Sequence, residues 1–196
     1  SNDYVLDEKS NRLGSLTPTP DSERTDREKL WSRMREQGYL FLPRQLDPED
    51  VLRFRSFYFQ SMLNSGTLRA GSDPMDGIGS EDDYDRAAFR DSLYNVVVPS
   101  REYAELCATP RLRDWFEWFL GEAPVLHKRR IIRQVGRGEK GIGAATQAHY
   151  DLVYLREGTD RVLSAWIPIG DCPVERGGLI YLEGTHRDIL EEEATG

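Results

Sequence analysis

The 196-residue chain has 38% hydrophobic residues, and its 34 acidic and 26 basic residues give a formal net charge of -8. A chain of this length forms one domain that buries about 70% of its unfolded surface. The acidic balance disfavours a nucleic-acid partner, and no apolar run approaches the roughly 20 residues that a membrane helix needs. Cys107 and Cys172 are isolated, and no charged-then-apolar signal segment opens the sequence. We therefore expect a soluble, cytoplasmic protein that acts on a small molecule.

The N-terminal half has the pattern of a helical layer. Residues 1–24 contain little apolar content and are expected to form a flexible arm. Thr25 and Glu28 match a capping box ahead of an amphipathic run, and Gly38 is placed to end that helix. Residues 39–42 then have the pattern of a short strand.

Two further helices are predicted by a capping residue followed by proline. Asp47-Pro48 starts a helix that is expected to end at Gly66, and Thr109-Pro110 starts one that is expected to end at Gly121. Between them, residues 65–91 are rich in Gly, Ser and Asp and predict a mobile loop. Its acidic run is explained either as solvated surface or as part of a lid, because long loops in compact domains often cover a site.

After the helices the sequence becomes rich in β-forming residues. The runs are 125–135, 147–155, 162–169 and 178–182, and clusters of Gly, Asp and Pro separate them. Consecutive strands joined by short turns predict an antiparallel sandwich or jelly roll rather than a parallel sheet.

His149 and Asp151 carry the clearest chemical signal in the chain. They are two residues apart, and residues i and i+2 of a β-strand point to the same face. An imidazole and a carboxylate on one face are two of the three ligands of a 2-His-1-carboxylate site, which leaves positions open on a non-haem iron. The sequence therefore predicts a metal site that requires one more histidine.

Several motifs stand in an order that resembles the phytanoyl-CoA dioxygenase family from about Asp26 onward. They are Glu36-Gln37-Gly38-Tyr39-Leu40-Phe41-Leu42, Leu120-Gly121, the Thr146-to-Asp151 run, Ala165-Trp166-Ile167-Pro168, and Gly177-Gly178-Leu179 to Gly184-Thr185-His186. The resemblance implies a mainly β fold, a double-stranded β-helix with an N-terminal helical layer. It places one oxygenase domain over 25–196, with the helical layer at 25–124 and the jelly-roll strands at 125–196.

The sequence departs from the family pattern at Arg176 and Glu183, where the family usually has Asn and Pro. By family position His186 is a turn residue, so the distal histidine and the oxoglutarate-anchoring arginine are expected downstream of Gly196. The jelly roll is then truncated after about four core strands. A fragment of a longer enzyme is favoured over a short inactive form, because an open sheet edge promotes aggregation.

The resemblance implies iron(II) ligated by His149 and Asp151, with 2-oxoglutarate and dioxygen as co-substrates. Because Asp151 is a carboxylate and not the alanine of related halogenases, hydroxylation is favoured over halogenation. Trp166 matches a position that lines the oxoglutarate pocket, and the family register favours Lys128 and Arg130 as partners of a carboxylate or phosphate group. Core packing for Trp166 and a solvated edge for the two bases are the alternatives.

Two other classes of protein stay open. One is a non-redox metal cupin, which usually has more clustered histidines than this chain. The other is a catalytically inactive jelly-roll binding scaffold, although both ligand types are retained. The sequence gives no sign of the substrate.

Overall fold

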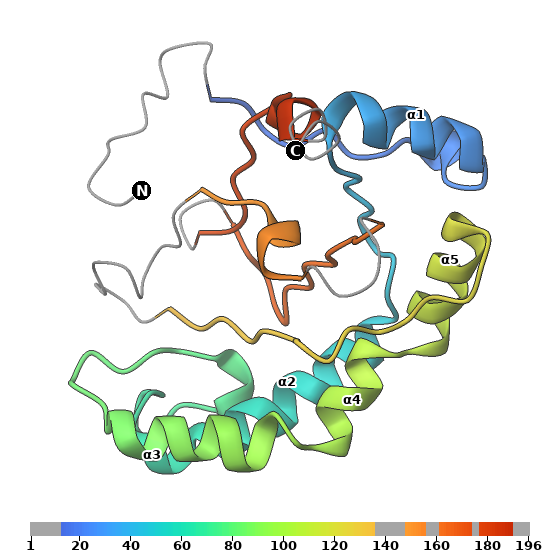
Figure 1. Ribbon diagram of the computed structural model, residues 1–196. Coiled ribbons are helices and arrows are strands. Elements are labelled where there is room, and N and C mark those ends of the chain that lie inside the picture. Colours follow the sequence, from blue (N-terminus) through green and yellow to red (C-terminus); the bar gives the residue numbers. More distant parts are fainter. Residues whose placement is uncertain (1–12, 136–147, 156–160, 174–176, 190–196) are drawn as a thin grey trace. The chain divides into compact units, whose positions relative to one another are not determined.

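The computed structural model describes residues 13–135, 148–155, 161–173 and 177–189 (Figure 1). Contacts divide these residues into two compact units. The split unit contains the described residues up to Pro43 and those from Ala148 onward. The helical unit is continuous and contains the described residues from Arg44 to Val135.

The split unit begins with a 3-10 turn, η1 (Asp21–Glu23), and helix α1 (Arg27–Gln37). The side chain of Asp26 caps α1 by accepting a hydrogen bond from the Lys29 amide at 3.1 Å. The capping box expected at Thr25 is therefore wrong by one residue, because a carboxylate one position later takes the role. Gly38 ends α1 in a left-handed conformation, as predicted.

The segment before α1 packs on the chain that follows it. The Thr19 amide donates to the Phe41 carbonyl at 2.8 Å, and Thr19 is only 2% exposed. Arg33 forms an ion pair of 2.7 Å with Glu23, on the side of α1 that faces this segment. Of the arm expected at 1–24, residues 1–12 lie outside the described part of the chain, and the later residues make these contacts.

The helical unit is built around α2 (Pro48–Met62). Asp47 accepts from the Glu49 amide and Pro48 occupies the first turn, as the sequence predicted. A 3-10 turn, η2 (Leu63–Ser65), follows, and Gly66 ends the run in the left-handed conformation. Three residues of α2 at spacing four form its buried face: Phe54, Tyr58 and Met62.

The expected loop at 65–91 contains regular structure. Leu68 and Gly79 form an antiparallel bridge, and the turn between them includes η3 (Pro74–Asp76). Arg55 of α2 donates to the Met75 carbonyl at 2.9 Å, which fastens this turn to the helix. The loop prediction is wrong at its end, where Asp85 caps helix α3 (Arg86–Asp91) by accepting from two amides.

Three more helical segments complete the unit. A π-helical segment, η4 (Ser92–Val97), continues α3 and buries Val97 completely. Helix α4 (Arg101–Cys107), capped by Ser100, was not predicted. Helix α5 (Pro110–Leu120) begins at Thr109 and ends at Gly121, as predicted. Phe54 and Tyr103 stack at 5.6 Å between ring centroids and join α2 to α4.

The mainly β jelly roll is wrong for the residues that the structure describes. The two units contain no sheet there, only the isolated bridges Pro18–Phe41 and Leu68–Gly79. The run predicted around His149 instead has a 3-10 turn, η5 (Asp151–Tyr154), and residues 185–189 are helical. The helical layer is present, but the expected strands and the short strand at 39–42 are not.

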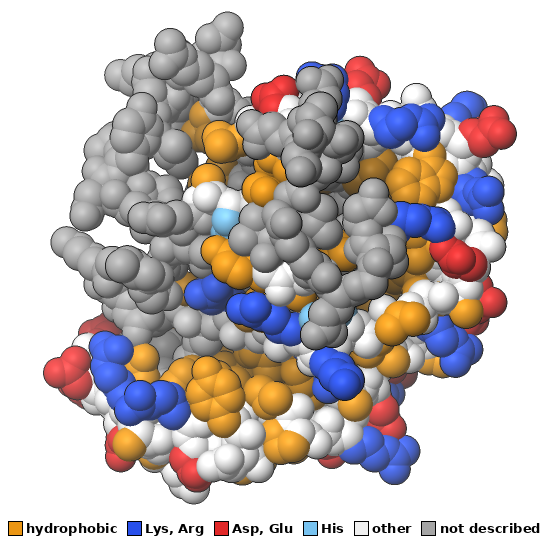
Figure 2. All heavy atoms as spheres, in the orientation of Figure 1, with side chains coloured by type: hydrophobic (Ala, Val, Ile, Leu, Met, Phe, Trp, Pro, Cys, Tyr) orange, Lys and Arg blue, Asp and Glu red, His pale blue; other side chains and the backbone are white. Residues whose placement is uncertain are grey.

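The physical reason lies in what β-propensity measures. It records how well a side chain fits a pleated surface that neighbouring strands supply. In the described residues no such neighbour pairs with these runs, and large apolar side chains on them stay exposed: Val125 is 93%, Ile131 66% and Leu182 63% exposed. Figure 2 shows hydrophobic side chains interspersed with basic ones on the face that it presents. No helix in the described ranges is long and apolar enough to cross a membrane.

We expect Gly38→Ala to lower the free energy of unfolding by more than about 1 kcal/mol. Its φ of +79° disfavours any side chain, at roughly 1 to 2 kcal/mol. An added Cβ would also lie 2.6 Å from Nδ1 of His186. Chemical denaturation followed by circular dichroism measures the loss.

Gly71→Ala is the matched control, because Gly71 has a φ of +78° and nothing within 4 Å of an added Cβ. It reports the conformational cost alone. In a His186→Ala background Gly38→Ala should become less destabilising. An equal loss with and without the His186 ring would contradict the steric part of the prediction.

Candidate metal site

His149 and Asp151 lie side by side in the split unit. His149 stands in irregular chain, and Asp151 is the first residue of η5. Nε2 of His149 is 3.5 Å from Oδ1 of Asp151, and their side chains are 36% and 47% exposed. The strand that was expected to align them is absent from this segment, yet the two side chains are neighbours.

Three other side chains surround this pair. The Ser164 hydroxyl donates a hydrogen bond to Oδ2 of Asp151. The Tyr154 ring meets the His149 ring edge-on at 5.6 Å between centroids. Tyr181 has its pKa raised, first by burial and then by the negative charge of Asp151 and by Tyr39. The pair as a whole therefore has polar and aromatic neighbours from three segments of the chain.

The donor atoms suit a divalent transition metal. Ligand atoms lie about 2.1 Å from such an ion, so two of them that share it are about 3.0 to 3.4 Å apart. The 3.5 Å between His149 and Asp151 is close to this separation. The described residues contain no group of three His, Cys, Asp or Glu that could hold a metal, so a third ligand for this pair is not among them.

His186 is engaged elsewhere in the split unit. Its Nε2 lies 2.9 Å from the Arg35 carbonyl in the last turn of α1, and because a carbonyl only accepts, Nε2 carries the proton. The ring packs over Gly38, where the missing Cβ leaves room for it. His186 lies in the helical residues 185–189 and not in the turn that was expected, and its ring is docked on α1.

Trp166 lies in the irregular segment 161–173 and is 47% exposed. It is therefore not part of the core that the described residues form, and its place in an oxoglutarate pocket stays a prediction.

Lys128 and Arg130 belong to the helical unit. Lys128 is exposed, and the Arg130 guanidinium lies over the Tyr103 ring, 5.1 Å from its centroid. Arg130 also interacts with the Cys107 thiol. Burial raises the pKa of this thiol, and the charge of Arg130 lowers it. Nearby, the Tyr58 hydroxyl donates to Oε1 of Gln134. The segment 125–135 therefore contacts α4 through Arg130 and α2 through Gln134.

Sequence reasoning missed Ser164, Tyr154 and Tyr181 as neighbours of the pair. Ser164 is a lone hydroxyl in the apolar run 162–166, and this was the one local signal available. The two tyrosines fit equally well as core or surface residues. Only the folded chain brings them to His149 and Asp151.

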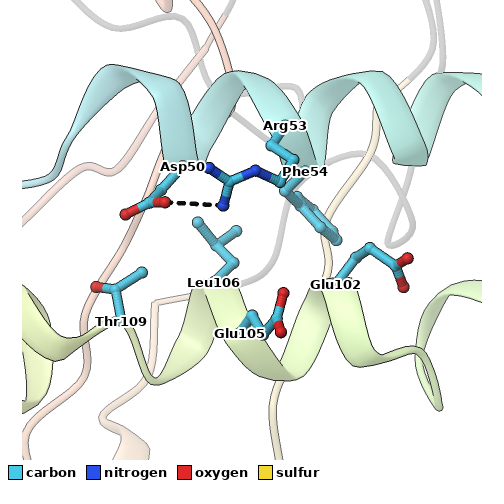
Figure 3. Close-up of a pocket in the computed structure, with 7 residues that line it drawn as sticks. All are labelled: Asp50, Arg53, Phe54, Glu102, Glu105, Leu106 and Thr109. Atoms are coloured by element: carbon cyan, nitrogen blue, oxygen red, sulfur yellow. Dashed lines mark hydrogen bonds and ion pairs between the residues drawn. The ribbon is translucent and has the colours of Figure 1, made fainter.

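A small pocket in the helical unit is not related to this pair. It lies between α2 and α4, and Figure 3 shows Arg53 turned toward Asp50, with an Nη1–Oδ1 distance of 3.0 Å. Its lining is Asp50, Arg53, Phe54, Glu102, Glu105, Leu106 and Thr109. None of the predicted site residues is among them.

A family model described as Phytanoyl-CoA dioxygenase (PhyH) matches residues 34–196. The match includes both candidate ligands, the whole helical unit and the split unit from Met34 onward. Comparison with curated proteins and with solved structures gave no match.

We expect His149→Ala and Asp151→Ala each to weaken binding of Fe(II) by more than about 100-fold, which exceeds the usual effect of residues outside the ligand set. Anaerobic titration calorimetry measures the affinity. His186→Ala is the control and should leave the affinity unchanged, because its imidazole is bonded to α1. Equal Fe(II) affinity in the parent and both ligand variants would refute the assignment.

The helical unit should lose stability in alkaline solution. Burial chiefly raises the pKa of Tyr103 to about 12, and burial also raises the pKa of Tyr58. An unfolded tyrosine releases its proton at about pH 10, so this stabilisation is complete below pH 10 and declines as the pH rises toward 12. Tyr103→Phe should flatten the decline in denaturation midpoint over this range. The same change at Tyr94, which is 63% exposed, is the control; a parent-like slope in Tyr103→Phe would contradict the argument.

Proposed function

Because this chain belongs to the phytanoyl-CoA dioxygenase family, we propose that it is an iron(II)- and 2-oxoglutarate-dependent dioxygenase that hydroxylates a small organic substrate. The family belongs to the superfamily of such dioxygenases. The observation that carries the proposal is the 3.5 Å approach of Nε2 of His149 to Oδ1 of Asp151.

His149 and Asp151 would hold the metal with one neutral and one anionic ligand. With a distal histidine they would form a 2-His-1-carboxylate set, which would leave room at the metal for a co-substrate and dioxygen. Bound iron supplies the redox chemistry that couples oxidative decarboxylation of 2-oxoglutarate to hydroxylation of the substrate. As a carboxylate, Asp151 would occupy the metal position that chloride takes in related halogenases, which favours hydroxylation over halogenation.

Lys128, Arg130 and Trp166 are the proposed co-substrate contacts. A cation recognises a carboxylate of 2-oxoglutarate by a charge-assisted hydrogen bond. The exposed Lys128 is the stronger candidate of the two bases, because the Arg130 guanidinium already lies on the Tyr103 ring. The partly exposed ring of Trp166 provides an apolar wall for the carbon chain.

Anaerobic addition of Fe(II) and 2-oxoglutarate tests the function. We expect a visible charge-transfer band from the chelate in the full-length gene product, and no band in its Asp151→Ala variant. Succinate formation in air, measured alongside, reports turnover. Metal binding without the band and without succinate would favour a non-redox metal protein, and no metal binding at all would favour an inactive scaffold.

Variants of the two bases separate their roles. Lys128→Gln should raise the 2-oxoglutarate concentration at which the band is half-formed and leave Fe(II) affinity unchanged. Arg130→Gln is the matched comparison and should have the smaller effect on the band. The opposite order would move the carboxylate contact to Arg130.

A further inference from the structure

We propose that Ser164 is a positioning residue for the Asp151 carboxylate, and that it directs a single carboxylate oxygen to the metal. This inference rests on the proposed function, because it concerns the same site. It adds a residue to that site which has no ligand role of its own.

The two oxygens of Asp151 have different partners. Oδ1 lies 3.5 Å from Nε2 of His149, and Oδ2 accepts a hydrogen bond from the Ser164 hydroxyl. A hydroxyl has one proton to donate, so this bond fixes which oxygen turns away from the imidazole. Oδ1 is thereby the oxygen that shares a side with His149.

One free oxygen has a chemical consequence. A carboxylate that rotates about its last bond can present both oxygens to a metal and fill two coordination positions. With Oδ2 held by Ser164, Asp151 would contribute one oxygen only. The positions that a co-substrate and dioxygen require then stay open.

The bond also connects two segments that nothing regular joins. Asp151 begins η5, and Ser164 lies 13 residues later in the irregular segment 161–173. Neither segment pairs with a strand among the described residues. Hydrogen-bonded partners of metal-ligating carboxylates commonly set metal affinity, and their loss weakens it by about 10- to 100-fold. Since Ser164 is exposed, we expect the low end of this range.

Co(II) binding tests the proposal, because its visible spectrum reports the number and arrangement of ligands. In Ser164→Ala we expect about tenfold weaker Co(II) binding and an altered spectrum. Ser164→Thr keeps the hydroxyl and should restore both. Ser72→Ala, which removes another exposed hydroxyl that donates to a backbone carbonyl, is the matched control and should resemble the parent.

Each outcome decides between explanations. Parent-like affinity and spectrum in Ser164→Ala would overturn the positioning role and leave the proposed function intact. If Ser164→Ala and Ser164→Thr lose thermal stability and Co(II) affinity to the same extent, the role of Ser164 is structural. That result would also overturn the positioning role. No Co(II) binding in the parent protein would overturn this proposal together with the metal site.

Discussion

The left-handed turn at Gly38 is the constraint on which the split unit depends. It ends α1 and turns the chain so that Tyr39 stacks on Tyr181 at 5.3 Å between ring centroids. Because Gly38 has no Cβ, the His186 ring fits over it and bonds to the last turn of α1. Tyr181 in turn lies near the Asp151 charge. A single backbone angle therefore links the first helix to the residues around the candidate ligands.

The helix ends were predictable because their signals are local. A capping side chain and the amide that it satisfies are two or three residues apart, so Asp47-Pro48 and Thr109-Pro110 could be recognised in the sequence. Asp85 had the same local signal before α3 but was hidden in a segment rich in Gly and Ser. The local sequence could not decide whether the expected strands form, because a strand is stabilised by another strand that the local sequence does not specify.

The residues of the candidate site also divide into those that the local sequence reveals and those that only the fold brings together. His149 and Asp151 were found from their spacing, and they are neighbours although the expected strand is absent. The donor to Asp151 comes from 13 residues away and could not be found from spacing, since any serine in an apolar run fits several roles. Arg130 shows the converse. The family register favoured it as a co-substrate contact, which stays a prediction, whereas its contact with the Tyr103 ring could not be predicted from the sequence.

The split unit also imposes an order on biosynthesis. Its contact between Arg35 and His186 joins residues 151 positions apart, whereas the helical unit is continuous in the chain. Translation at about 5 to 20 residues per second puts roughly 8 to 30 seconds between the emergence of these two residues. Within that interval the whole sequence of the helical unit emerges, whereas Arg35 and Tyr39 still lack their partners His186 and Tyr181. The contacts around Gly38 can therefore form only after the helical unit has been synthesised.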